Sequence, residues 1–206
     1  MGSAEEDRTG PQAALMSFAP PSSDRAPGWP IRRPAPSRRC SIEIVGQLLA
    51  PAVVPYIYRD VLNSILRFSD GGDRHERGGF LLGGYFEDEG EYVEITHFLP
   101  AQHTDSSAAQ LTFTHETWSQ LNREVERRDD GQKVVGWQHT HPNLGVFLSQ
   151  YDRFIHQHFF SAPWQVALVV DPRRGEFAFF QWSGSAIEDC GFVLVHGVPP
   201  VRLPTR

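Results

Sequence analysis

Apolar strand-like segments and amphipathic helical segments alternate along residues 41–196, and this alternation limits the possible folds more than any other feature. The helical segments place apolar side chains three and four residues apart, whereas the strand-like segments are short and largely apolar. We expect helices at residues 52–68, 114–128 and 150–160, and strands at residues 41–49, 78–86, 91–99, 133–138, 164–170, 176–182 and 192–196. This order predicts an α/β domain, with a mixed central β-sheet between helices in a three-layer α/β/α arrangement.

The ends of the chain differ from this middle part in composition. Residues 1–40 contain seven of the 16 prolines and six arginines but few large apolar side chains. Such a segment cannot bury enough apolar surface to offset the entropy lost on ordering, so we expect an extended or disordered tail. The predicted organisation is an N-terminal tail at residues 1–40, one domain at residues 41–196 and a C-terminal tail at residues 197–206.

The overall composition excludes several classes of protein. The 206 residues are 40% hydrophobic and carry a net charge of −6, which argues against a nucleic-acid binder because such proteins present a basic surface. The sequence has neither an apolar run of about 20 residues, as a membrane span requires, nor a secretory signal in its first thirty residues. We therefore expect a cytoplasmic protein. The only two cysteines, Cys40 and Cys190, exclude a disulfide scaffold, and Cys190 is expected in the core.

Two of the nine histidines, His139 and His141, are separated by a single residue at the end of a predicted strand. Side chains at positions i and i+2 of an extended segment point to the same face, and Pro142 then ends strand pairing. Ser149 begins the next predicted helix, and Asp152 follows three residues later, which turns its carboxylate toward the helix N-terminus. This Ser-x-x-Asp pattern is also that of a helix capping box. Two imidazoles and one carboxylate are a ligand set of catalytic zinc, with a fourth position open for water.

The remaining histidines receive plainer interpretations. His156 lies one helical turn beyond Asp152, and we interpret it as an outer neighbour of the site or a surface residue, because a fourth protein ligand would close the open position. His158 is interpreted as structural. The other five lack partners at ligand spacing and are interpreted as ordinary residues: His75, His97, His103, His115 and His196.

Four segments of the chain form a longer pattern: Glu76-x-x-Gly79-x-x-Leu82-Gly83, Val134-Val135-Gly136-Trp137-x-His139-Thr140-His141-Pro142, Leu148-Ser149-x-x-Asp152 and Val166-Ala167-Leu168-Val169-Val170-Asp171-Pro172. This pattern resembles the JAMM (MPN-plus) zinc metalloproteases, and the resemblance extends over roughly residues 45–185. Thr140 occupies a position where serine is commonest in the family, and we expect no loss of activity from this exchange of small hydroxyl residues.

The resemblance implies a fold, an activity and residue roles. The fold would be the JAMM/MPN fold, which is similar to that of cytidine deaminases, and the activity would be that of a zinc isopeptidase. His139, His141 and Asp152 would bind one zinc ion. Glu76 would take a proton from the metal-bound water and pass it to the leaving amine, and Ser149 would donate a hydrogen bond to the developing oxyanion. Without the resemblance, Glu76 would be interpreted as an ordinary solvated acid.

The resemblance also implies partners. The expected substrate is ubiquitin or a ubiquitin-like protein, released from lysine or from a precursor, with its extended C-terminal tail added to a sheet edge. The polar segment around residues 103–111 is expected to shape the channel for that tail. The composition is typical of a GC-rich bacterial gene, which points to antiphage systems with their own activating and conjugating enzymes. The sequence leaves three alternatives open: a small-peptide or sulfur-carrier-processing metallohydrolase, a non-catalytic MPN scaffold, and a two-His-one-carboxylate iron oxygenase.

Overall fold

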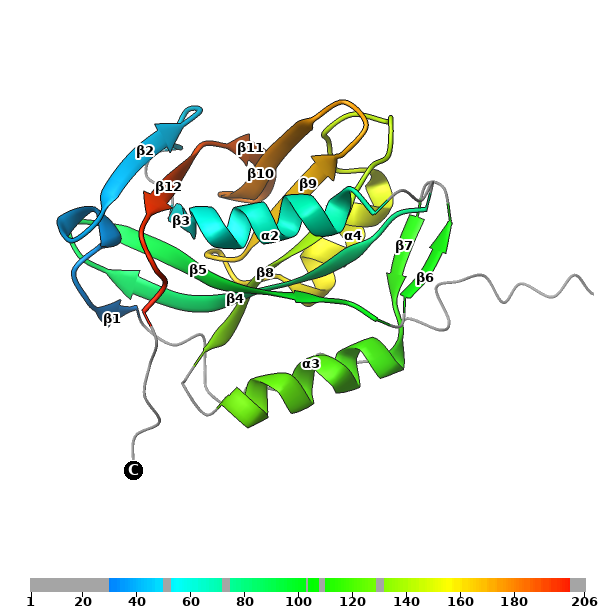
Figure 1. The fold of residues 1–206 in the computed structure, drawn as a ribbon, viewed down its shortest axis with the longest axis horizontal. Coiled ribbons are helices and arrows are strands. Elements are labelled where there is room, and N and C mark those ends of the chain that lie inside the picture. The colour runs from blue at the N-terminus through cyan, green and yellow to red at the C-terminus, as the bar shows by residue number, and fades with distance from the viewer. Residues whose placement is uncertain are drawn as a thin grey trace, which may run out of the picture.

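The computed structural model describes residues 30–49, 53–71, 75–102, 104–107, 110–128 and 132–200 (Figure 1). The predicted tail segments at residues 1–29 and 201–206 lie outside these residues, and so does His103. The helices are η1 (Pro36–Arg38, a 3-10 turn), α2 (Arg59–Ser69), α3 (His115–Arg128) and α4 (Gln150–Phe159). The strands are β1 (Ile31–Arg32), β2 (Ser41–Val45), β3 (Val54–Tyr58), β4 (Gly78–Glu87), β5 (Glu91–Pro100), β6 (Thr104–Ser107), β7 (Gln110–Phe113), β8 (Lys133–Thr140), β9 (Val166–Asp171), β10 (Glu176–Ser183), β11 (Ala186–Cys190) and β12 (Phe192–His196).

One mixed sheet runs through the molecule in the order β11-β10-β9-β8-β4-β5-β3-β12-β2, and β1 pairs with β4. The neighbours β8 and β9 are parallel, as are β3 with β5 and β3 with β12, while the β4–β5 and β4–β8 pairs are antiparallel. The predicted mixed sheet is therefore confirmed. Strands β8 and β9 lie inside this order, away from both edges, where both faces are covered and apolar side chains are favoured throughout.

Helices cover the two faces of the sheet and divide the core into two clusters. On one face, α2 buries Val61, Leu62 and Ile65 against sheet residues that include Leu81 and Val135. On the other face, helices α3 and α4 pack against β4 and β9. The helices contribute Trp118, Leu121 and Ile155, and the strands contribute Phe80, Leu82 and Val169. Figure 1 shows α2 on one side of the sheet and α3 apart from it. The predicted three-layer α/β/α architecture is the one observed.

The helix predicted at residues 52–68 is wrong in its first part. Residues Val54–Tyr58 form β3, between β5 and β12, and the helix begins only at Arg59. Apolar residues at positions 54, 57, 58, 61, 62, 65 and 66 fit a helical period, but the first three lie in β3 and pair inside the sheet. Ile57 and Tyr58 are fully buried there, and this tertiary burial overrides the local pattern.

Two further elements differ from the sequence-based expectation. The polar segment around residues 103–111, for which no strand was expected, contains β6 and the start of β7, and these two strands pair with each other as a separate antiparallel hairpin. Residues Ala186–Cys190, where no strand was expected, form β11, which pairs with β10 across a short turn. Cys190 ends β11 and lies partly buried against the core, as expected for a core residue rather than a nucleophile.

Residues 30–40, which composition assigned to the tail, form β1 and η1 and are bound to the domain through Glu94. The Glu94 side chain is fully buried, and it is paired with Arg33 (2.8 Å) and Arg39 (2.7 Å). The guanidinium of Arg33 also lies 4.7 Å from the centre of the Phe86 ring. Arginine-rich composition is typical of a tail, but here two of the arginines neutralise a buried carboxylate, which is costly to leave unpaired.

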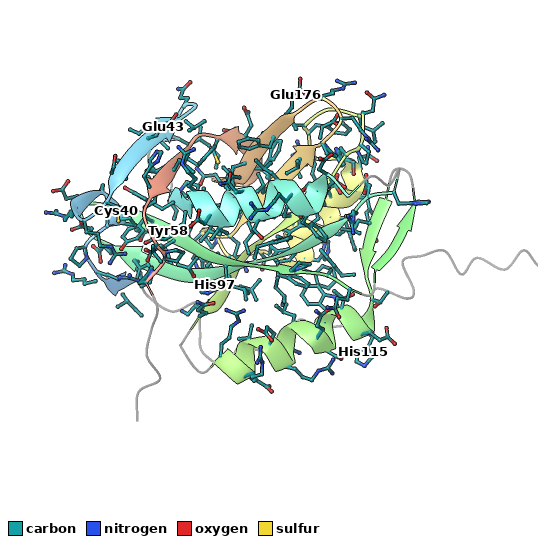
Figure 2. The ribbon with its side chains drawn as sticks, viewed as in Figure 1. Cys40, Glu43, Tyr58, His97, His115 and Glu176 are labelled. Carbon is teal, nitrogen blue, oxygen red and sulfur yellow. The ribbon has the colours of Figure 1, made fainter. Side chains whose placement is uncertain are left out.

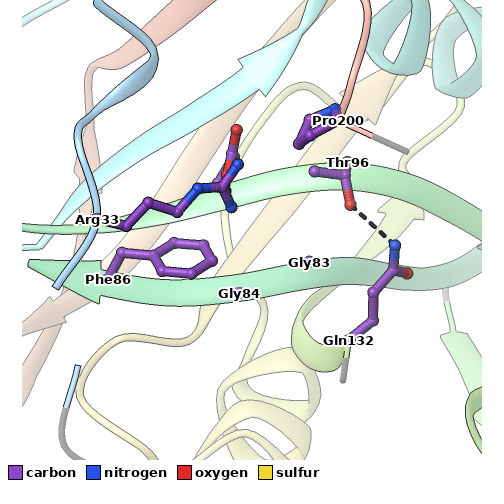
Figure 3. Close-up of a pocket in the computed structure, with 8 residues that line it drawn as sticks. Arg33, Gly83, Gly84, Phe86, Thr96, Gln132 and Pro200 are labelled. Carbon is purple, nitrogen blue, oxygen red and sulfur yellow. Dashed lines mark hydrogen bonds and ion pairs between the residues drawn. The ribbon is translucent and has the colours of Figure 1, made fainter. Parts of the chain in front are cut away.

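A small hollow of about 20 Å³ lies beside this segment (Figure 3). Arg33, Phe86, Thr96 and Gln132 contribute to its lining, and the Gln132 amide donates a hydrogen bond to the Thr96 hydroxyl. None of the predicted zinc ligands lines it. Among the described residues, no helix is both long enough and apolar enough to cross a membrane.

Candidate metal centre

His139 and His141 lie at the carboxyl end of β8, and a β-bulge determines which face of the sheet they occupy. The β4–β8 register shifts between Leu81 and Leu82, whose partners are Gly136 and Val134. Because of this shift, Val135 faces α2 whereas Trp137 faces α3 and α4. Both histidines come after Trp137 on the same side of the sheet. Their side chains are buried, with exposed fractions of 0% for His139 and 2% for His141.

The N-terminus of α4 brings Asp152 to the same place. Ser149 is the N-cap residue: its hydroxyl accepts the Asp152 backbone N–H (3.2 Å), and its own N–H donates to Asp152 Oδ2 (2.7 Å). This reciprocal capping box turns the carboxylate back toward β8. Asp152 Oδ1 lies 3.4 Å from Nε2 of His139, and Oδ2 lies 3.4 Å from Nε2 of His141.

The three side chains fit the donor set of a zinc ion. One ligand atom from each lies within 4.8 Å of the others, and the two Nε2 atoms are 3.1 Å apart. Zinc ligands at about 2.0–2.1 Å in a tetrahedron are separated from one another by about 3.3–3.4 Å. The two Nε2 atoms, 3.1 Å apart, are close to such an edge. Each of them also lies 3.4 Å from its nearer carboxylate oxygen, which is Oδ1 for His139 and Oδ2 for His141. The structure therefore brings together the three residues that the spacing predicted, with a donor chemistry that suits zinc.

Burial and electrostatic interactions shift the pKa values of the three residues in different directions. Burial works against the charged form of Asp152, but the charge and hydrogen bonds of His139, together with hydrogen bonds from His141 and Ser149, lower its pKa. Burial lowers the pKa of His139. For His141, burial also opposes the charged form, but Asp152 and Glu76 outweigh it and raise the pKa. An ionised carboxylate beside a neutral imidazole is the state in which these groups bind a metal.

Glu76 lies beside the cluster without joining it. Its side chain is buried, Oε1 is 3.6 Å from His141 Nε2, and among the described residues Oε2 has no hydrogen-bond partner. Burial raises the pKa of Glu76 to about 7, with Asp152 adding to the rise and His141 opposing it. A carboxyl group with a pKa near neutrality can both accept and release a proton at working pH.

Two backbone contacts fix the segment that carries Glu76. The N–H of Arg77 donates to Thr140 Oγ1 (2.9 Å), and the N–H of Thr140 donates to the Arg77 carbonyl (2.8 Å). Gly78 follows where the chain passes close to β8: a Cβ added there would lie 2.6 Å from the Gln138 carbonyl oxygen. The segment thus keeps its place through contacts with the strand that also carries the histidines.

Asp171, at the end of β9, shapes the loop between His141 and Ser149, and the sequence analysis did not assign it this part. Its buried carboxylate accepts the backbone N–H groups of Asn143 (2.9 Å) and Gly145 (2.7 Å), both of which have positive φ angles. The available signal was an acid at the end of an otherwise apolar buried strand, followed by a turn.

The same loop exposes two large apolar side chains. Leu144 and Phe147 are each 44% exposed, and the Phe147 ring centre lies 4.7 Å from that of His141. Sequence reasoning did not single out either residue. Exposed apolar side chains are common singly, but two in a loop that borders a buried polar cluster provide a contact surface there.

The other histidines that the structure describes lie outside the cluster of ligand atoms. His156 is fully buried, so its interpretation as a surface residue is wrong and the alternative of an outer neighbour agrees with its position. Burial lowers the pKa of His156 to about 4. His158 is exposed and contacts the Phe154 carbonyl of its own helix (2.8 Å). His97 and His115 lie on separate elements, β5 and α3 (Figure 2).

Fold and cluster together define an MPN-type α/β domain with a His–His–Asp candidate metal centre. The sequence profile of the JAB1/Mov34/MPN/PAD-1 ubiquitin protease family matches residues 55–162, which is more than half of the chain. The chain therefore belongs to this family. The predicted resemblance to the JAMM/MPN-plus proteins is confirmed at the level of the family.

Individual relatives share part of their length with this chain. It is 36% identical over 117 residues to COP9 signalosome complex subunit 5 of Eremothecium gossypii, covering 54% of this chain and 26% of that protein. It is 32% identical over 99 residues to the NAD(+) hydrolase TcpA of a Theionarchaea archaeon, covering 48% of this chain and 27% of that protein. The chain thus spans about a quarter of the length of these relatives.

A solved structure shows the same fold at low sequence identity. The solution structure of protein DSY2949 from Desulfitobacterium hafniense superposes with a TM-score of 0.55 and 17% identity. The superposition covers 70% of this chain and 95% of that one. At this identity the likeness concerns the fold alone.

Proposed function

We propose that this protein is a zinc-dependent isopeptidase that hydrolyses the bond after the C-terminus of a ubiquitin-like protein. The observation that carries the proposal is the convergence of two imidazole Nε2 atoms and one carboxylate within 4.8 Å, with Glu76 Oε1 3.6 Å from one of them. His139, His141 and Asp152 would hold the metal. When bound, zinc supplies a Lewis acid that lowers the pKa of a coordinated water to about 7.

The residues around the metal divide the remaining work. Glu76 takes a proton from the attacking water at its carboxylate and delivers it to the departing lysine amine, a role that its near-neutral pKa supports. The hydroxyl oxygen of Ser149 accepts the Asp152 N–H, which leaves its own O–H free to donate to the developing oxyanion. The backbone next to Glu76 is held against β8, and the Ser149 hydroxyl is held by the Asp152 N–H, so little reorganisation is needed as charge develops.

Features around the site support a polypeptide substrate. Leu144 and Phe147 offer apolar contact surface beside the cluster. The β6–β7 hairpin lies near the Glu76 segment, because Leu111 of β7 packs against Gly78, two residues after Glu76. An extended C-terminal tail could add a strand along this hairpin, with main-chain hydrogen bonds for affinity and small residues at the scissile bond.

The test uses two substrates and one metal analysis. The purified chain is assayed on a linear ubiquitin fusion and on ubiquitin joined to lysine by an isopeptide bond, together with Glu76→Gln and the control Glu126→Gln on the exposed face of α3. We expect one equivalent of zinc, cleavage by the wild type and the control, and a loss of at least about a hundredfold in Glu76→Gln.

Other results would refute the proposal. A wild-type chain that binds no zinc would favour the scaffold alternative, and cleavage of short peptides alone would favour a peptide metallohydrolase. Equal rates for Glu76→Gln and wild type would exclude the proposed base.

A further inference from the structure

The His139 ring lacks a hydrogen bond that metal-binding histidines commonly make. Such histidines commonly donate their second ring N–H to a carboxylate or a carbonyl, which fixes the ring plane. Here the side chain is fully buried, and Nδ1 has no hydrogen-bond partner among the described residues. Another contact must therefore fix the plane of this ring.

Trp137 provides that contact. Its ring lies parallel to the His139 ring, with centres 4.4 Å apart and an interplanar angle of 11°. The two residues are i and i+2 on β8, so their side chains share one face of the strand. Trp137 is itself fully buried and also lies parallel to Phe160, at 5.7 Å and 11°. The imidazole is thus in contact with a large flat surface that has little freedom to tilt.

His156 holds the other end of the Trp137 ring. The indole Nε1–H donates to His156 Nδ1 at 3.1 Å, and His156 is fully buried. Because an indole nitrogen can only donate, Nδ1 must be the acceptor and the His156 proton resides on Nε2. His156 lies four residues after Asp152, one turn along α4. The same helix therefore supplies one candidate ligand and the acceptor that fixes the orientation of another.

We propose that Trp137 and His156 form a positioning pair that sets the plane of the His139 imidazole and thereby raises the affinity of the centre for zinc. The inference rests on the proposed zinc function and adds two residues to it. Neither residue touches the metal or the substrate, and their effect passes through His139. Loss of such an outer partner typically weakens metal affinity by about tenfold to a hundredfold.

Two substitutions at position 156 separate the hydrogen bond from simple packing. His156→Leu keeps comparable bulk but removes the acceptor, whereas His156→Gln offers a carbonyl oxygen to the indole N–H. His158→Leu is the matched control, because His158 is exposed on the same helix. Zinc affinity is measured by competition with a chromogenic chelator, the ligand field by the visible spectrum of the cobalt-substituted protein, and folding by the thermal midpoint without metal.

We expect His156→Leu to bind zinc about tenfold or more weakly and to have an altered cobalt spectrum, with His156→Gln within about threefold of wild type and His158→Leu unchanged. If His156→Leu does not fold, Trp137→Phe, which keeps a flat ring and removes the donor, is expected to show the same loss of affinity.

Two outcomes would overturn the inference while the proposed function stands. One is wild-type zinc affinity and spectrum in the folded variants that lack the hydrogen bond. The other is that His156→Leu and His156→Gln lose zinc affinity equally, and only to the extent that their thermal midpoints fall. That result would indicate a purely structural role for His156. If the wild-type chain binds no zinc, the proposed function fails as well, and the metal measurement on wild type distinguishes the two cases.

Discussion

Replacing Asp171 by asparagine tests how firmly the loop at the candidate metal centre is held. The buried Asp171 carboxylate accepts four backbone N–H groups: Oδ1 accepts those of Asn143, Arg173 and Arg174, and Oδ2 accepts that of Gly145 at 2.7 Å. Burial by itself would raise the pKa of Asp171, but these four donors lower it. The carboxylate is therefore stabilised in its charged form by backbone groups of this loop, Asn143 and Gly145, and of the turn after β9, Arg173 and Arg174.

The magnitude follows from the number of acceptors that asparagine retains. Its carboxamide oxygen can keep the three bonds made by Oδ1, but its NH₂ group then faces the Gly145 N–H, and two donors oppose each other. One hydrogen bond to a charged group, worth about 1.5–3 kcal/mol, is lost, and a buried donor remains unpaired at a cost of about 1–3 kcal/mol. The two costs arise from the same broken contact and so do not add in full. We therefore expect a loss of about 3 kcal/mol in the free energy of unfolding at pH 7.

The assay is urea unfolding of wild type, Asp171→Asn and the exposed control Asp189→Asn, which should change stability by less than about 0.5 kcal/mol. The folded pKa of Asp171 lies below its unfolded value of about 4, so its stabilisation is complete above pH 4 and is lost as the pH falls through the folded pKa. The gap between wild type and Asp171→Asn should therefore narrow in acid. A gap below about 0.5 kcal/mol at pH 7, or one that widens in acid, would refute the reasoning.

Three further predictions concern the site and the N-terminal segment. Zinc at about a thousand times its dissociation constant should raise the unfolding free energy of wild type by about 4 kcal/mol, and thermal unfolding of His139→Ala should show no such gain. Burial raises the folded pKa of Glu76 to about 7, above its unfolded value of about 4.3, so folding takes up a proton and stability falls as pH rises between these values. Metal-free Glu76→Gln should therefore be more stable than wild type by about 1–2 kcal/mol at pH 8, and a less stable variant would contradict this. Glu94→Gln should lower the unfolding free energy by about 3 kcal/mol, because Arg33 and Arg39 lose a buried partner; denaturant unfolding that matches wild type would show that their pairing contributes nothing.

Local sequence rules predicted that His139, His141 and Asp152 come together, because their geometry depends on residues close to one another in the sequence. A strand places His139 and His141 on one side, and a capping box turns Asp152 toward the helix N-terminus. The same rules could not show that Glu76, more than sixty residues away in sequence, lies 3.6 Å from His141; that expectation came from the family resemblance.

The expectations that failed depended on long-range partners. Residues Val54–Tyr58 fit a helical period, yet pairing with β5 and β12 makes them a strand. The arginines of residues 30–40 looked like those of a solvated tail because their partner Glu94 lies more than fifty residues away. Composition records neither pairing nor burial, so it could not distinguish a charged tail from a segment that neutralises a buried acid.

The sequence by itself determined the alternation of strands and helices, the mixed α/β class and the ligand spacing, because each depends on backbone periods and contacts within a few residues. Only the tertiary structure decided which face of the sheet the histidines occupy, since the bulge opposite Leu81 and Leu82 turns Trp137 and its successors away from α2. Burial in that layer then set the near-neutral pKa of Glu76 and paired His156 with Trp137. Desolvation and pairing across elements arise only when the chain is packed, so no local pattern specifies them.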